Sequence, residues 1–223
     1  MSSFAEENYL KAIYKLSERT EGEIYTNDIA KRMQTSAASV TDMLKKLAKK
    51  KFINYQRYKG ISLTELGIRT ALGVIRKHRL WEMFLVKVLG FKWDEVHEVA
   101  EQLEHVRSEK LIQHIDKFLN YPKFDPHGDP IPDMHGNFGS KQKPFSLSEG
   151  KTNQKYIMNG VVDHSTSFLN VLDKLGVSLG VKMTISSIQS YDRSLHVQLN
   201  SKEKIFLSNQ IAKNILVLHD KNK

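Results

Sequence analysis

The chain has 223 residues, enough for a substantial hydrophobic core and two or three small domains, and its 34 Lys and Arg against 25 Asp and Glu give a formal net charge of +9 at pH 7. This balance favours a polyanionic partner, with nucleic acid ahead of a membrane surface, and the absence of cysteine excludes disulfides and thiolate metal ligands. The chain has no signal-like opening and no stretch near the ~20 apolar residues of a membrane span, so we expect a cytoplasmic protein without a membrane partner.

The start of the chain predicts three helices that contain a helix-turn-helix. Apolar residues recur at helical spacing over residues 4–19, over a short segment 27–33 that Thr26 can cap, and over residues 37–50. Residues 34–36 form a short polar turn between the second and third helices. Two short helices joined by a tight turn, the second with small polar residues at its start, are typical of a helix-turn-helix.

Residues 52–64 predict a two-stranded hairpin with Gly60 near its tip, which is the wing of a winged helix. An ordinary amphipathic helix is the alternative for residues 37–50. Against it, the non-core face carries short polar residues that can reach base edges, followed by lysines that can meet phosphates. The candidate DNA-binding residues are Thr26, Ser36, Ala37, Ser39, Thr41, Lys45, Lys46, Arg57 and Lys59.

The middle of the chain predicts a helical dimerisation unit. Residues 64–89, 93–106 and 108–119 each show an apolar face at helical spacing, and Gly90 ends the first of these helices. Together they carry more apolar helix surface than one small domain needs, so we expect them to pair with a second copy of the chain. The alternative is a monomeric helical domain.

Histidines and glutamates line one face of two of these helices. Side chains three and four residues apart share a helix face, and two such His and Glu stripes favour metal binding over a charged seam between subunits. His97 and His105 would lie roughly 12 Å apart along a helix, and metal bonds are only about 2 Å long, so two ions are indicated. The two sets are Glu101, Glu104 and His105 in one, and His78, Glu82 and His97 in the other.

Beyond residue 121 the helical pattern stops. Residues 121–140 are rich in proline and glycine and predict an irregular linker. Its Asp125 and His127 could reach the metal sites, although loop residues of these types are usually solvated. After Gly150 the pattern turns to β and predicts a small barrel-like domain. Its expected strands cover residues 154–162, 181–190, 195–199, 204–207 and 215–218, with a helix at 165–175 and one helical turn at 208–212.

The order of these motifs resembles the family of metal-dependent transcriptional repressors that contains the diphtheria toxin repressor and the manganese transport regulator. The run from Arg76 to Glu82, followed by His97 to His105, carries the resemblance, and residues 7–14 are similar to the family's first helix. The resemblance implies a mainly α fold with a small β domain. Its parts are an N-terminal winged helix-turn-helix over residues 1–65, a helical dimerisation and metal-binding domain with its linker over 66–140, and a C-terminal SH3-like, FeoA-like barrel over 151–223.

The resemblance also implies which residues bind metal. Carboxylate, amide and imidazole groups without sulfur suit Mn²⁺ or Fe²⁺. Zn²⁺ binds such groups more tightly, so selectivity must come from coordination geometry and metal supply. The implied ligands are Glu101, Glu104, His105 and Asn8 at the primary site, and His78, Glu82, His97, Asp125, His127 and Asp163 at the second.

We therefore expect a homodimeric repressor of metal-uptake genes, and no enzymatic activity. Mn²⁺ or Fe²⁺, at two sites per subunit, would activate it to bind double-stranded DNA at a palindromic operator. Two alternatives remain open at this point. One is a two-metal hydrolase that uses the same His and Glu groups, and the other is a winged-helix regulator that senses an organic ligand.

Overall fold

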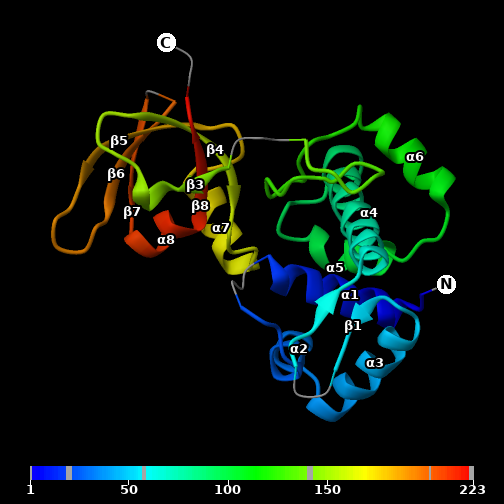
Figure 1. Ribbon diagram of the computed structural model, residues 1–223. Helices are drawn as coiled ribbons and strands as arrows, with labels where there is room; N and C mark the ends of the chain where they lie inside the picture. Colours follow the sequence, from blue (N-terminus) through cyan, green and yellow to red (C-terminus); the bar gives the residue numbers. More distant parts are fainter. Residues whose placement is uncertain (1, 19–21, 57–58, 140–142, 201, 221–223) are drawn as a thin grey trace. The chain divides into compact units, whose positions relative to one another are not determined.

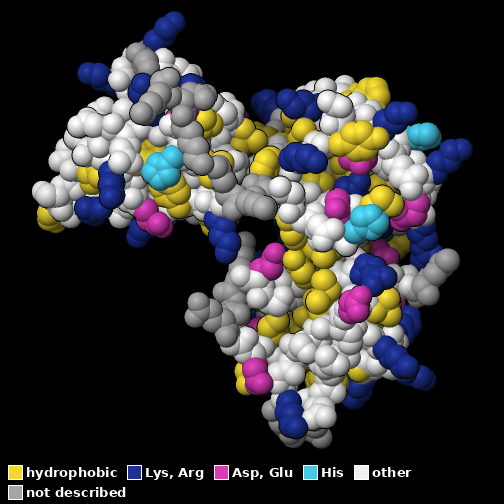
Figure 2. Space-filling view, turned by 45° about the horizontal axis from the view of Figure 1, so that its top comes forward, with side chains coloured by type: hydrophobic (Ala, Val, Ile, Leu, Met, Phe, Trp, Pro, Cys, Tyr) yellow, Lys and Arg dark blue, Asp and Glu magenta, His cyan; other side chains and the backbone are white. Residues whose placement is uncertain are grey.

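The chain folds into two compact units (Figure 1). The computed structural model describes residues 2–18, 22–56, 59–139, 143–200 and 202–220. Lys and Arg side chains stand at the surface of both units (dark blue in Figure 2), and none of the described helices is long and apolar enough to cross a membrane. The first unit comprises Met1–His78, Glu101–Gln113 and Pro132–Phe138, and the second comprises Arg79–Ala100, His114–Ile131 and Gly139–Lys223.

Three helices open the first unit and form the predicted helix-turn-helix. Ser3 and Glu6 make a capping box at the start of the first helix, because each side chain accepts a hydrogen bond from the other residue's backbone N–H. Ser36 caps the third helix by accepting a hydrogen bond from the N–H of Ser39. The helices are α1 (Phe4–Ser17), α2 (Thr26–Met33) and α3 (Ala37–Lys49).

Tyr25, rather than the predicted Thr26, is the N-cap of α2. The backbone N–H of Tyr25 donates to Oδ2 of Asp28 at 2.8 Å, so Thr26 is already the first helical residue. At the other end, Gln34 adopts a left-handed φ of 51°, and its N–H returns to the last turn of α2. This residue makes the tight turn toward α3.

The predicted wing is a short antiparallel hairpin, in which Ile53 lies opposite Leu63. An isolated bridge between Ile24 and Ile61 ties the hairpin to the segment before α2. The DNA-binding candidate Arg57 lies outside the described residues. The hairpin strands are β1 (Ile53–Asn54) and β2 (Ser62–Leu63), and the fully buried core of this unit contains Leu10, Ile13, Ile29, Val40, Leu44 and Leu47.

The ligand-bearing helix is shorter than predicted. The expected helix over residues 93–106 is wrong at both ends, since α5 covers only Val96–Leu103. A hydrogen-bonded turn precedes it, and Glu104 and His105 follow it in a second turn, which the N–H of Val106 closes by donating to the carbonyl of Leu103. The neighbouring helices, α4 (Glu65–Leu89) and α6 (Glu109–Phe118), agree with prediction to within one residue.

The second unit contains a six-stranded antiparallel sheet in the order β3-β8-β4-β5-β6-β7, which confirms the small SH3-like β domain. Its core includes the fully buried Tyr156, Leu169, Met183 and Val217. Sequence patterns missed β3, which pairs with the distant β8 rather than in a local hairpin, and the three-residue helix η1. The elements are β3 (Phe145–Ser146), η1 (Leu147–Glu149), β4 (Lys155–Val161), α7 (Thr166–Lys174), β5 (Lys182–Ile188), β6 (Leu195–Leu199), β7 (Glu203–Leu207), α8 (Asn209–Asn214) and β8 (Ile215–His219).

Part of the expected linker is an ordered loop of the second unit that packs against β4. Gly128 has a φ of +89°, and a Cβ at this position would lie 1.9 Å from the backbone oxygen of Asn159. The N–H of Val161 donates to the carbonyl of His127 at 3.0 Å. The loop therefore holds His127 in a fixed position, which only a glycine at residue 128 permits.

Candidate metal centre

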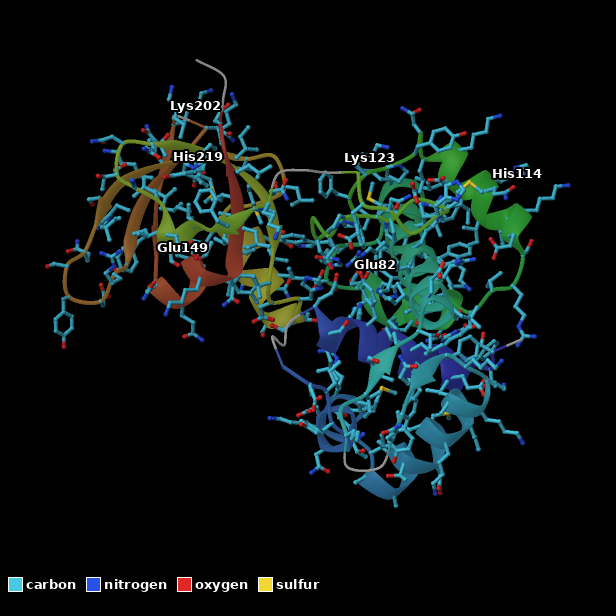
Figure 3. All side chains as sticks on the ribbon, viewed as in Figure 1. Glu82, His114, Lys123, Glu149, Lys202 and His219 are labelled. Atoms are coloured by element: carbon cyan, nitrogen blue, oxygen red, sulfur yellow. The ribbon has the colours of Figure 1, made fainter. Side chains whose placement is uncertain are left out.

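Three ionisable side chains of the second unit meet in its interior, and we call Glu82, Asp125 and His127 the Asp125 cluster. Glu82 comes from α4 and is labelled in Figure 3, whereas Asp125 and His127 come from the loop that packs on β4. The three are 2%, 2% and 1% exposed. One ligand atom from each lies within 4.8 Å of those of the other two. Such a convergence of buried charges is costly without a cation or protons to offset it.

The backbone of the loop arranges the Asp125 cluster. Oδ1 of Asp125 accepts hydrogen bonds from the N–H groups of His127 at 2.8 Å and Asp129 at 2.9 Å. This turn leaves Oδ2 of Asp125 to other partners, and Arg79 Nε lies 3.6 Å from it. Arg79 also contacts Asp129 at 3.1 Å. Oδ1 of Asp125 thus holds the turn of the loop, while Oδ2 faces the other charged groups.

The ring of His127 is oriented for metal binding. Nε2 lies 2.7 Å from the carbonyl oxygen of Trp93, which can only accept, so Nε2 carries a hydrogen. The lone pair of the neutral ring is then on Nδ1, which lies 3.8 Å from Oε2 of Glu82. Within the part of the chain that the structure describes, buried Nδ1 has no hydrogen-bond partner. A backbone carbonyl behind a ligating imidazole is the usual support of a metal-binding histidine.

Protons are held tightly at the Asp125 cluster. Burial raises the pKa of Asp125 to about 7, and the charge of Glu82 adds to this effect. Burial opposes protonation of His127, but its interaction with Glu82 and the charge of Asp125 outweigh burial and raise the pKa of His127 to about 9. A divalent ion would displace these protons. Two carboxylates and one imidazole, all buried, fit an ion such as Mn²⁺, Fe²⁺ or Zn²⁺.

Two more histidines lie beside the Asp125 cluster. His97 Nδ1 is 3.4 Å from Oε1 of Glu82, and its side chain is 46% exposed. The ring of His164 stacks on that of His127 with centroids 4.8 Å apart. Sequence analysis named the neighbouring Asp163 instead, whose Oδ1 accepts a hydrogen bond from the N–H of Ser165 at the start of α7. His164, the residue after Asp163, was missed because it lies in a segment without helical or strand periodicity.

A second group of ionisable residues, buried except for the partly exposed Glu101, lies in the first unit, and we call it the Glu104 cluster. His78 Nδ1 is 2.7 Å from Glu104 Oε2, and His105 Nδ1 is 2.7 Å from Glu7 Oε2. His105 Nε2 also lies 3.6 Å from Glu104 Oε1. Sequence analysis had placed His78 in a set with Glu82 and His97 and did not predict this contact with Glu104. The members of the Glu104 cluster are Glu7, Lys11, His78, Glu101, Glu104 and His105.

Lys11, like Glu7, is a member that sequence analysis missed. Its Nζ lies 2.7 Å from Glu101 Oε1, and 2.6 Å and 2.8 Å from the two carboxylate oxygens of Glu104. The signal was available, since Glu7 and Lys11 are four apart on α1 and share a face. The predicted ligand Asn8 lies beside them, and its buried Oδ1 has no hydrogen-bond partner among the described residues.

The DNA-binding candidates that can be described lie at the surface of the helix-turn-helix and the wing. Ser36 and Ser39 are exposed, with their Oγ atoms 2.9 Å apart, and Thr41 donates to the carbonyl of Ala37. Lys45 pairs with Asp42 at 3.2 Å on the exposed face of α3. Ala37, Lys46 and Lys59 are exposed, and Thr26 is half-buried.

Family models match three consecutive parts of the chain. The N-terminal DNA-binding domain of iron-dependent repressors matches residues 2–61, and their metal-binding and dimerisation domain matches residues 64–133. A FeoA domain matches residues 145–219. The iron-dependent repressor IdeR of Mycobacterium tuberculosis is 37% identical over 128 residues, which is 57% of this chain and 55% of that protein. The chain thus spans about half the length of the curated relatives of this kind.

Two solved structures are similar over nearly the whole chain. A manganese-dependent transcriptional repressor in complex with manganese has a TM-score of 0.83 at 30% identity, and the alignment covers 96% of this chain and 99% of that one. ScaR with bound Cd²⁺ has a TM-score of 0.75 at 33% identity, with 96% and 99% covered. These relatives are DNA-binding regulators rather than enzymes. The chain belongs to the family of metal-dependent transcriptional repressors that includes the iron-dependent repressors and the diphtheria toxin repressor.

Proposed function

We propose that the protein is a homodimeric, metal-activated DNA-binding repressor that controls metal-uptake genes. The observation that carries this proposal is the Asp125 cluster, a buried set of nitrogen and oxygen donors within 4.8 Å of one another in a chain that also carries a winged helix. Metal binding there would order the loop of residues 122–131 and favour one conformation of the repressor. A repressor acts beside the chromosome, so we also propose a cytoplasmic location.

We propose Mn²⁺ or Fe²⁺ as the activating ion, held by Glu82, Asp125 and His127. His97 and His164 lie next to these residues and are candidates for a fourth ligand, as is Asp163. The absence of sulfur supports a preference for these ions over Cu⁺, while Zn²⁺ remains a competitor by affinity. The resemblance implied a primary metal site at Glu101, Glu104, His105 and Asn8. We propose that the activating ion binds at the Asp125 cluster instead, because Lys11 already contacts Glu101 and Glu104.

The DNA partner is proposed to be a palindromic operator that two recognition helices of a dimer read. Ser36, Ser39 and Thr41 at the start of α3 would face base edges, and Lys45, Lys46 and Lys59 would face phosphates. The two-fold symmetry of a homodimer supports a palindrome, since each half-site then meets the same surface.

The test is DNA binding as a function of metal. Duplexes would be selected from a randomised pool with the full-length protein in Mn²⁺, and their affinities measured by fluorescence anisotropy in Mn²⁺, Fe²⁺ (anaerobically), Zn²⁺ and EDTA. We expect tight binding with metal, weak binding in EDTA, and loss of the metal response in Glu82→Gln. Glu98→Gln, an exposed change on α5, is the matched control. Binding of equal strength in EDTA would reject metal activation and favour a regulator that senses an organic ligand.

A further inference from the structure

Lys11 lies where a cation between two glutamates would lie. Its ammonium nitrogen is within 2.6–2.8 Å of three carboxylate oxygens, one from Glu101 and two from Glu104. An ammonium group has three N–H donors and no acceptor, so these three oxygens saturate it. Lys11 is 7% exposed and Glu104 is fully buried, which makes this an internal ion pair rather than a surface contact.

A divalent ion does not fit between these two glutamates while Lys11 is there. Metal–oxygen bonds are about 2.0–2.2 Å long, so an ion bound to both carboxylates would be in direct contact with the ammonium group. The two positive charges would repel each other beside the fully buried Glu104. The protonated lysine also has no lone pair to offer as a ligand. The donor set of the Glu104 cluster therefore disagrees with a metal ion at this position.

We propose that Lys11 is the resident cation of the Glu104 cluster and replaces the divalent ion between Glu101 and Glu104. A side-chain charge then performs the structural task of an ion, because it joins α1 to the turn after α5 at all metal concentrations. This inference rests on the proposed function in one respect, which is that divalent ions bind at the Asp125 cluster.

The same helix is also tied to the recognition helix. Glu6, the neighbour of Glu7 on α1, lies 2.8 Å from Nζ of Lys50, which caps the end of α3. Glu7 contacts His105, and the hydroxyl of Ser2 donates to Glu7 at 2.7 Å. Lys11 thus joins α1 to Glu101 and Glu104, and Glu6 joins α1 to Lys50 at the end of α3. Neither ion pair needs a metal.

The first test counts bound ions in charge variants of the full-length protein. The proteins compared are the wild type, Lys11→Gln, Lys11→Arg and the exposed control Lys31→Gln. Mn²⁺ per subunit would be measured by equilibrium dialysis with elemental analysis. Tm would be measured in EDTA and in Mn²⁺. Lys11→Gln should have a lower Tm in EDTA, bind one further Mn²⁺ per subunit and regain the lost Tm with Mn²⁺. Lys11→Arg and Lys31→Gln should match the wild type. Equal ion counts in Lys11→Gln and the wild type would overturn the proposal.

A second test does not depend on the folding of the Lys11 variants. Glu101, whose side chain is 38% exposed, can be changed to Gln in the otherwise native chain. Its Mn²⁺ count should stay at the wild-type value, whereas Glu82→Gln should lose an ion. A lower count in Glu101→Gln would overturn the role of Lys11. An unchanged count in Glu82→Gln would instead reject the Asp125 cluster as the metal site, and would leave the inference on Lys11 to the first test.

Discussion

His127 and Trp93 are joined by a contact of 2.7 Å between the ring Nε2 and a backbone oxygen, and this contact turns the other ring nitrogen toward Glu82. The acceptor is part of the main chain, so no side-chain substitution at Trp93 removes it directly. The orientation of the histidine is therefore set by the path of the backbone, and the chemistry of the Asp125 cluster depends on how well the loop holds its shape.

Metal affinity should rise with pH. The pKa of His127 is raised to about 9, so in the metal-free protein the imidazole is protonated at neutral pH and an ion must displace that proton. Between pH 7 and 8.5 the dissociation constant for Mn²⁺ should fall by about tenfold per pH unit. Below about pH 7 the dependence should steepen, because Asp125 also takes up a proton there. Calorimetric titration in two buffers of different ionisation enthalpy would measure the protons released, and a flat pH profile would contradict the assignment.

Gly128→Ala should weaken metal binding. The φ of +89° costs a non-glycine residue about 1–2 kcal/mol, and the added Cβ would also meet the oxygen of Asn159, so the loop must move. We expect a loss of Mn²⁺ affinity of roughly tenfold or more, measured by isothermal titration. Gly73→Ala is the control, since no atom lies within 4 Å of a Cβ placed there. It should leave affinity unchanged and stabilise α4 by up to about 1 kcal/mol. Native affinity in Gly128→Ala would show that the loop is not needed for the site.

Ser3→Ala should lower the free energy of unfolding by about 1 kcal/mol, the usual effect of losing an N-cap. Ser3 and Glu6 form the capping box of α1, the helix that carries Lys11. Urea unfolding of the metal-free protein would measure the change. Ser17→Ala, at the exposed end of the same helix, should change stability by no more than about 0.5 kcal/mol. Equal effects of the two changes would speak against the cap.

DNA binding should depend steeply on salt through Lys46 and Lys59. Each phosphate contact that is lost should flatten the slope of log affinity against log salt concentration by about 0.9. The double variant Lys46→Ala, Lys59→Ala should therefore lose about 1.8 in slope, as measured by anisotropy from 50 to 300 mM KCl. Lys174→Ala, on α7, is the control and should keep the wild-type slope. An unchanged slope in the double variant would place the phosphate contacts elsewhere.

Periodic patterns predicted the helices and strands well, because apolar spacing reports directly on burial. The wing hairpin, α4 and all strands of five or more residues were found in this way. The predicted C-terminal end of α5 was wrong because Glu104 and His105 keep the helical spacing although they lie in a turn. Spacing describes which residues could share a face and does not report where a helix stops.

The candidate sites were less predictable, since their members meet through tertiary contacts. Asp125 and His127 were suspected from their residue types, but nothing local indicated that both are buried. The pairing of His78 with Glu104 and the stack of His164 on His127 depend on how separate segments approach each other. Lys11 was not predicted because a protonated lysine is not a metal ligand, although it can neutralise the same carboxylates.

The donors of the Asp125 cluster have a consequence for oxidative stress. Thiolates and thioethers are converted by peroxide into sulfenic acids, disulfides or sulfoxides, and a sensor built on them responds to oxidants as well as to metals. Glu82, Asp125 and His127 contain no sulfur, and the whole chain has no cysteine. Peroxide would therefore find no thiolate or thioether to oxidise among these proposed ligands.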